Sequence, residues 1–164
     1  MDYPSWSIRK VVPRKIDPLS RAQHRRIAGE LFNHVWSLLD KKDRGQEEDD
    51  EMLHAAHASR FHWGLAGTPL NLSVGEWQVS RVYATLGRAE PALYHARRAL
   101  EIARRSRLSR FYLAYAYEAV ARAAAVAGER RTRDRYLRRA REIGAGVRDR
   151  DDRRMLLEDL ATIP

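Results

Sequence analysis

The 164-residue chain contains no cysteine, which excludes disulfide bonds, thiol nucleophiles and thiolate metal sites. It also lacks an apolar run of about 18 residues, so no membrane-spanning helix is expected. The N-terminal segment MDYPSWSIRKVVPRK has no apolar signal-peptide core, and we therefore expect a cytoplasmic location. Runs of β-branched residues are scarce, whereas Leu, Ala, Arg and Glu are abundant, so the expected fold class is all-α.

Proline is also scarce, and three of the six prolines lie near the N-terminus. Pro4, Pro13 and Pro18 would each interrupt a helix, so residues 1–18 are expected to form an extended arm. Hydrophobic residues make up 44% of the chain, which excludes general disorder. Residues 19–164 are therefore expected to fold as a single helical domain with its own core.

Apolar residues recur at the helical spacing i, i+3, i+4, i+7 along most of the chain. Ser20 and Asp149 are suited to cap the first and last helices, and Asn71 or Ser73 the third. The pattern predicts about seven helices, over residues 20–40, 48–66, two within 75–103, then 109–127, 129–145 and 150–162.

The helix expected over residues 48–66 is apolar on two sides. Met52 and Ala56 mark one side, whereas Phe61 and Leu65 mark the other. A helix with two apolar faces is usually enclosed by neighbours, so we expect this helix to be sandwiched.

Residues 75–103 form the clearest unit, two helices joined by a tight turn at residues 86–88. Gly87 suits a positive φ at the turn, and the small residues Ala92 and Ala99 allow two helix backbones to approach closely. A second copy follows, in which Gly128 and Ala140 take equivalent roles, and the two glycines are 41 positions apart (128 − 87). We expect these five residues to bring the helices together.

This unit resembles a tetratricopeptide repeat (TPR), in the long-helix class with a period near 40. Tyr83 matches the large aromatic of the family's first helix, Gly87 the turn glycine and Ala92 the small residue opening the second helix. Glu76 departs from the family by occupying the usual Trp position, with Trp77 one residue later. The resemblance implies a TPR-like stack of antiparallel helix pairs with a C-terminal capping helix.

The resemblance also implies a binding groove lined by the first helix of each pair. Arg81 and Arg122 would anchor carboxylates of a partner. The aromatic start of the helix at 109–127 suits either a groove or a thick core layer. We therefore expect a non-enzymatic protein- or peptide-binding scaffold, in which the open end of the stack would allow a homo-oligomer. The expected groove residues are Glu76, Trp77, Ser80, Arg81, Tyr83, Tyr117, Glu118 and Arg122.

Histidines and carboxylates in the N-terminal half suggest an alternative, a metal- or small-ligand-binding helical bundle. Glu51 and His54 have the i, i+3 spacing of a carboxylate-bundle ligand pair, but a second such pair is missing. A buried polar network that fixes helix register ranks above a ligand site, so no cofactor is expected. His95 is expected at the surface. The candidate ligands are Glu30, His34, Glu51, His54, His57, His62 and Glu76.

Acidic residues are fewer than basic ones: the chain has 22 Asp and Glu against 31 Lys and Arg, which gives a net charge of +9. Residues 1–82 carry +1 (12 − 11) and residues 83–164 carry +8 (19 − 11). A genome rich in G and C favours Arg and Ala codons, and this explanation ranks first. Nucleic-acid binding ranks below protein binding, because acidic residues are interleaved and no known motif is present. It would use the sixth helix and Arg97, Arg98, Arg104, Arg105, Arg107 and Arg110.

Catalytic motifs are absent from the sequence. Gly64, Gly67 and Gly75 lack the spacing and the preceding strand of a phosphate-binding loop, and there is no serine nucleophile elbow. An enzyme would have to use the histidine and carboxylate residues, and we expect a non-enzymatic protein.

Overall fold

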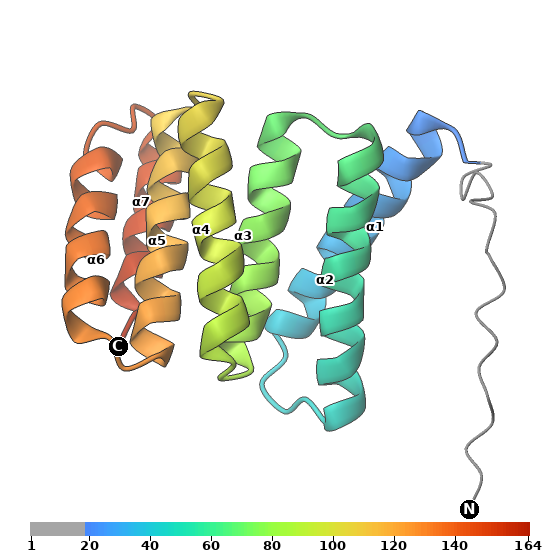
Figure 1. Cartoon of the computed structure of the whole chain (residues 1–164), viewed down its shortest axis with the longest axis horizontal. Helices are drawn as coiled ribbons and strands as arrows, with labels where there is room; N and C mark the ends of the chain where they lie inside the picture. Colours follow the sequence, from blue (N-terminus) through green and yellow to red (C-terminus); the bar gives the residue numbers. More distant parts are fainter. Residues whose placement is uncertain (1–18) are drawn as a thin grey trace, which may run out of the picture.

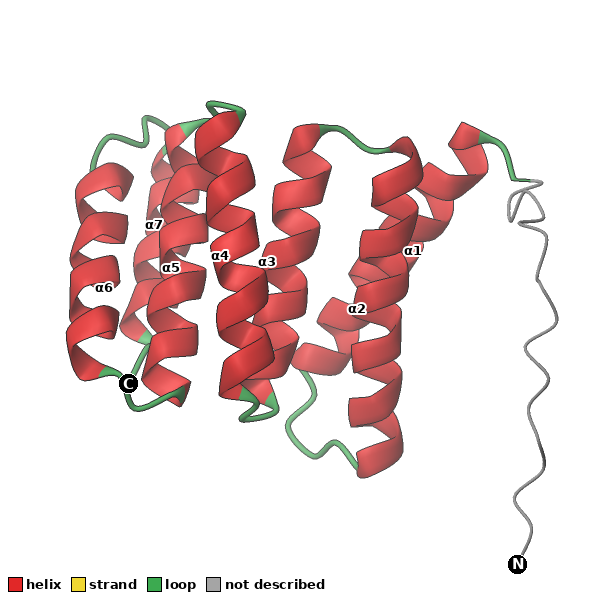
Figure 2. Cartoon of the chain, viewed as in Figure 1, coloured by secondary structure: helices red, strands yellow, loops and turns green. Residues whose placement is uncertain are grey.

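The computed structural model describes residues 19–164, so the expected arm at 1–18 lies outside the described residues. The described part is all-α and contains no strand, as the sequence predicts (Figure 2). None of its helices is long and apolar enough to cross a membrane. The seven helices are α1 (Arg21–Leu39), α2 (Gln46–Ala66), α3 (Pro69–Thr85), α4 (Ala89–Arg105), α5 (Arg110–Val126), α6 (Arg130–Gly144) and α7 (Arg150–Ala161).

The helices form a layered stack in chain order, from α1 at the blue end to α6 and α7 at the red end (Figure 1). Each helix from α1 to α6 packs against the next, and α3 also packs against α1 and α5. Helix α7 contacts both α5 and α6. Among the described residues no Cα atoms of α2, α4 and α6 lie within 8 Å of one another, so these three helices do not pack backbone to backbone. The odd-numbered helices therefore line one side of the stack and the even-numbered helices the other, as in a helical repeat.

Small residues hold the layers together, as predicted for the three alanines. Ala92, Ala99 and Ala140 are each 0% exposed and lie between helices. Buried serines support the same close approach, because the Ser80 hydroxyl donates to the Ala92 carbonyl at 2.9 Å and the Ser73 hydroxyl to the Ala99 carbonyl at 3.0 Å. The core is consequently rich in alanine, and its helices approach closely through short side chains.

The prediction that glycines also press the helices together is wrong. Gly87 and Gly128 are exposed, and a Cβ added at either would meet open space. Their φ angles are +70° and +72°, in the left-handed region that disfavours side chains. These glycines therefore reverse the chain between helices instead of bringing helices into contact.

Three turns of the stack share one hydrogen-bonding pattern. After α3, the Arg88 amide donates to the Tyr83 carbonyl at 2.9 Å, and after α5 the Glu129 amide donates to the Ala124 carbonyl at 2.9 Å. This six-to-one bond defines a Schellman motif, whose central residue adopts a positive φ. The turn after α4 has the same bonds, but Arg107, at φ +50°, holds the position that glycine occupies in the other two.

Exchanging residues at these turns is expected to change stability in opposite directions. Arg107→Gly should raise the free energy of unfolding by about 0.5 kcal/mol, because the left-handed strain of about 1–2 kcal/mol outweighs glycine's extra unfolded-state entropy. Gly128→Ala should lower it by about 1 kcal/mol. Urea unfolding of both variants measures the two effects. A loss of stability in Arg107→Gly would contradict the assigned turn geometry.

Two local expectations are corrected by the structure. The cap of α3 is Thr68, whose hydroxyl accepts from the Asn71 amide, and Pro69 occupies the first helical position. Asn71 is the third residue of this capping box and Ser73 is buried within the helix, so neither caps it. The second apolar side of α2 is open instead of sandwiched, because Phe61 is 56% and Leu65 is 43% exposed.

Candidate functional site

An aromatic pocket opens on the side of the stack formed by the odd-numbered helices. Its volume is about 210 Å³, many times the roughly 10–15 Å³ that one water needs. Helices α1, α3, α5 and α7 each contribute side chains, so the pocket exists only when these four helices are assembled. We call this hollow the aromatic pocket; its lining includes Phe32, Trp36, Trp77, Phe111, Tyr112, Tyr115, Met155 and Asp159.

The aromatic side chains of the pocket contact one another in edge-to-face arrangements. The ring centroids of Trp77 and Tyr115 lie 5.4 Å apart at 76°, and those of Phe111 and Tyr115 lie 4.9 Å apart at 74°. Trp36 of α1 and Trp77 of α3 are instead tilted at 38°, with ring centroids 5.6 Å apart. Such pairs restrict ring motion, so the pocket is preorganised to receive an apolar group.

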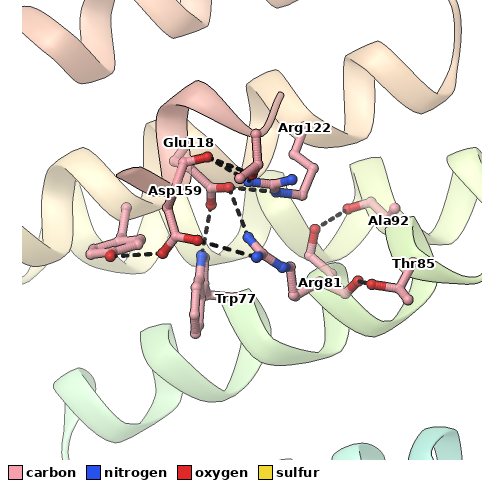
Figure 3. Close-up of polar contacts among 10 residues, drawn as sticks. Trp77, Arg81, Thr85, Ala92, Glu118, Arg122 and Asp159 are labelled. Atoms are coloured by element: carbon pink, nitrogen blue, oxygen red, sulfur yellow. Dashed lines mark hydrogen bonds and ion pairs between the residues drawn. The ribbon is translucent and has the colours of Figure 1, made fainter. Parts of the chain in front are cut away.

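A buried carboxylate, Glu118 of α5, is hydrogen-bonded to Trp77 of the pocket lining (Figure 3). Its side chain is fully buried and accepts the Trp77 indole N–H at 2.9 Å. Arg81 donates to the same carboxylate at 3.2 Å and Arg122 at 2.6 Å. Glu118 thereby fixes the orientation of Trp77 and joins α3 to α5.

Asp159 of α7 extends this network to the end of the stack (Figure 3). One carboxylate oxygen accepts from Arg81 at 3.2 Å and the other from the Tyr115 hydroxyl at 2.9 Å. Burial, and then the negative charge of Asp159, raise the pKa of Tyr115 well above its usual range, so this phenol remains a donor. Arg122 also donates to the Asp159 carbonyl at 3.0 Å. Helix α7 is therefore attached to the pocket wall by charged hydrogen bonds.

The charges of this network balance within the chain. Two arginines, Arg81 and Arg122, face two carboxylates, Glu118 and Asp159. If Arg81 and Arg122 anchored the carboxylates of a partner, as the sequence predicts, those carboxylates would compete with Glu118 and Asp159 for the two arginines. Because each arginine already has an internal carboxylate partner, the pocket offers an incoming group chiefly apolar contact surface.

The eight expected groove residues divide between two sides of the stack. Four of them belong to the aromatic pocket or to its adjoining network of hydrogen bonds: Trp77, Arg81, Glu118 and Arg122. The other four lie elsewhere: Ser80 faces α4, Tyr83 bonds to His57, Tyr117 packs on Tyr136, and Glu76 points between α2 and α4.

Glu76 forms a second buried charge cluster. Its carboxylate, 4% exposed, accepts from Arg60 of α2 at 2.9 Å and from Arg98 of α4 at 3.1 Å, and pairs with His95 of α4 at 2.6 Å. Burial alone would raise the pKa of Glu76, but hydrogen bonds from His95 and Arg98 and the charge of Arg60 lower it to about 2. Three helices are joined at this carboxylate. His95 is therefore largely buried, and the expectation that it lies at the surface is wrong.

Two further aromatic side chains pack beside Glu76. The His57 ring nitrogen is 2.9 Å from the Tyr83 hydroxyl, and the His95 ring stacks on Tyr83 with centroids 5.8 Å apart. Burial and the neighbouring His95 lower the pKa of His57, which favours its neutral form at neutral pH. This arrangement is a buried polar network of the kind the sequence predicts for part of its histidine set.

The candidate metal ligands do not converge. His34 pairs with Glu51 at 2.8 Å on the surface, and Glu30 pairs with Arg26. The Nδ1 atom of His62 lies instead 2.6 Å from the Nδ1 atom of His24. His54 is exposed, and Glu76 is engaged by arginines. Within residues 19–164 no group of three or more His, Asp or Glu side chains is placed to hold a metal ion.

The sequence interpretation missed most of the pocket lining. Phe32 and Trp36 have i, i+4 spacing on α1, a signal that they share a face, but they were not assigned to a groove. Met155 and Asp159 have the same spacing on α7. Only the assembled stack shows that these pairs meet across α3 and α5, because helical spacing carries no information about distant partners.

In comparisons with known proteins, no family model, no curated protein and no solved structure matches the chain. Any functional conclusion therefore rests on the geometry described above.

Proposed function

We propose that this protein is a TPR-like, non-enzymatic scaffold whose aromatic pocket binds a large apolar side chain of a protein or peptide partner. The observation that carries this proposal is the pocket itself, formed by all four odd-numbered helices and lined largely by aromatic side chains. In TPR-like proteins the first helix of each pair lines the binding groove, and the odd-numbered helices hold that position here. A cytoplasmic location remains a prediction.

The repeat geometry supports the TPR-like part of the proposal. Equivalent turn residues with positive φ occur at positions 87, 107 and 128, so one helix and one turn span 20 or 21 residues. Two such units span 41 positions, in agreement with a long-helix repeat. Helices α1 and α2, α3 and α4, and α5 and α6 are then the three pairs, and α7 is the capping helix.

The balance of charge supports an apolar anchor on the partner. Arg81 and Arg122 are held by internal carboxylates, and separating them to bind a partner's carboxylate would leave Glu118 buried without its counterions. An apolar side chain buries surface without disturbing these bonds, and full burial of a large one contributes about 1.5–3 kcal/mol. We therefore expect the partner to carry an exposed Leu, Met, Phe or Trp.

A matched pair of substitutions on α7 tests this proposal. Met155 lines the pocket and is 51% exposed, whereas Leu157 is 49% exposed and does not line it. Peptides are first selected from a random displayed library against the full chain. Met155→Arg should weaken their binding by about tenfold or more, because it adds a charge to an apolar site. Leu157→Arg should leave the affinity within about twofold, since it adds the same charge away from the pocket. Titration calorimetry measures both affinities.

Equal effects of the two substitutions would show that binding depends on overall charge or on another surface. Selected peptides that lack large apolar residues would contradict the proposed anchor. Both α7 variants alter half-exposed positions, so circular dichroism should show the unchanged helix content that makes the comparison valid.

A further inference from the structure

A second hollow surface lies on the other side of α5, away from the aromatic pocket. Helices α4 and α6 each pack on α5, and in the described part of the chain no Cα atoms of α4 and α6 lie within 8 Å of each other. Three hollows of about 380–440 Å³ open between and along these helices and share Arg104. We call this surface the arginine groove; its charged lining is Arg97, Arg104, Arg105, Arg110, Arg135, Arg138, Arg139, Glu101 and Glu142.

The two recognition surfaces use opposite faces of α5. At about 100° per residue, Leu113 and Tyr117 lie roughly opposite Phe111 and Tyr115. Leu113 and Tyr117 line the arginine groove, whereas Phe111 and Tyr115 line the aromatic pocket. A ligand bound in the arginine groove therefore leaves the aromatic pocket open.

The charge of the groove is strongly positive. Its lining contains seven arginines and two glutamates, a net charge of +5 (7 − 2). Glu101 pairs with Arg105 at 3.2 Å and Glu142 with Arg139 at 2.8 Å. In residues 19–164 no ion pair engages the other five groove arginines, in contrast to the paired arginines of the aromatic pocket. The acidic residues interleaved in the sequence thus neutralise only part of this surface.

We propose that the arginine groove binds the phosphate backbone of single-stranded nucleic acid, a role beyond the protein- or peptide-binding function proposed above. Arginine is suited to phosphate through its forked donors. Residues 97–105 of α4 span about 12 Å at 1.5 Å per residue, which matches roughly three to four nucleotides of a base-stacked strand at about 3.4 Å each. The groove is therefore long enough to contact several consecutive phosphates.

Two tyrosines favour a nucleic acid over an acidic protein. Tyr117 and Tyr136 line the groove with ring centroids 5.8 Å apart, and the Arg135 guanidinium lies 5.1 Å from the Tyr136 centroid. Aromatic rings and guanidinium planes among cations are the features on which unpaired bases stack. An acidic peptide has no bases and would gain only the electrostatic attraction.

The test compares two double variants of equal charge. Fluorescence anisotropy follows a labelled oligothymidine of about 12 nucleotides binding to the full chain at several salt concentrations. Contact with three to four phosphates predicts a slope of log affinity against log salt of about −2 to −3. Arg104→Gln with Arg138→Gln should weaken binding about tenfold and reduce the slope magnitude by about 1.4.

The control is Arg26→Gln with Arg154→Gln, which removes the same charge at side chains 67% and 70% exposed outside the groove. This control should change the affinity by less than about threefold. An oligomer of the same length without bases should bind about fivefold or more weakly, because stacking contributes about 1 kcal/mol or more per base.

Equal losses in both double variants would overturn the proposed groove, and no binding at low salt would overturn nucleic-acid binding altogether. Equal binding of the baseless oligomer, or equal competition by polyglutamate, would show a general polyanion site and contradict the nucleic-acid assignment. Met155→Arg, which alters the other side of the stack, should leave oligothymidine binding unchanged, so the two proposals fail independently.

Discussion

Glu118→Gln is expected to lower the free energy of unfolding by about 3–5 kcal/mol, the range measured when one partner of a buried ion pair is removed. Glu118 is fully buried and accepts hydrogen bonds from Trp77, Arg81 and Arg122. The neutral amide preserves the side-chain shape. It leaves Arg81 with Asp159 as its remaining carboxylate partner, and Arg122 with only the Asp159 backbone carbonyl and the Thr162 hydroxyl.

Thermal and urea unfolding monitored by circular dichroism measure this loss. For a chain of this size, about 3–5 kcal/mol corresponds to a fall in melting temperature of roughly 6–20 °C. Glu101→Gln is the matched control, since it removes an i, i+4 ion pair whose side chains are 79% and 61% exposed. That control should change stability by less than about 0.5 kcal/mol. Equal, small effects of both substitutions would contradict the structural role assigned to Glu118.

Glu76→Gln is expected to destabilise the protein by about 3 kcal/mol at neutral pH, with a loss that diminishes in acid. The pKa of Glu76 is lowered from 4.5 to about 2, because its bonds to His95 and Arg98 and the Arg60 charge outweigh the effect of burial. Lowering the pKa from 4.5 to about 2 corresponds to about 3 kcal/mol. This carboxylate joins α2, α3 and α4, so the variant also tests how firmly these helices are connected.

The sign of the pH dependence follows from the lowered pKa. The stabilisation by ionised Glu76 is complete above the unfolded-state pKa of 4.5 and is lost as pH falls through about 2. Glutamine does not titrate, so the stability difference between the two proteins should be constant above about pH 5.5 and shrink between pH 5 and 2. Urea unfolding of both proteins across this range measures the difference. A difference that stays constant down to pH 2 would contradict the assigned environment of Glu76.

Helix periodicity predicted the fold well because the core depends on local spacing. Ala92 and Ala99 recur at intervals that place both on one face of α4, and the structure buries both. The start of α3 was mispredicted, because Asn71 or Ser73 was expected to cap the helix although it begins at Pro69. Proline is also favoured at the first helical position, where its missing N–H has no partner to lose, and Thr68 supplies the cap.

The candidate site was predicted only in part, because a shared helix does not imply a shared face. At about 100° per residue, Trp77 and Arg81 lie within about 40° of each other on α3, whereas Glu76 and Tyr83 lie about 100° and 120° from Trp77 and farther still from Arg81. Asp159 is 78 positions from its partner Arg81 and no local pattern connects them. The charge balance that makes the pocket apolar in character therefore depends on tertiary structure alone.

The central claim, an aromatic pocket that binds a partner's apolar side chain, is tested most directly by the indole N–H signals in a two-dimensional NMR spectrum. Trp36 and Trp77 line the pocket, whereas Trp63 of α2 does not, and it serves as the internal reference. Titration with a selected peptide should shift the signals of Trp36 and Trp77 and leave that of Trp63 unchanged. A bound peptide that shifts Trp63 while leaving Trp36 and Trp77 in place would contradict the account.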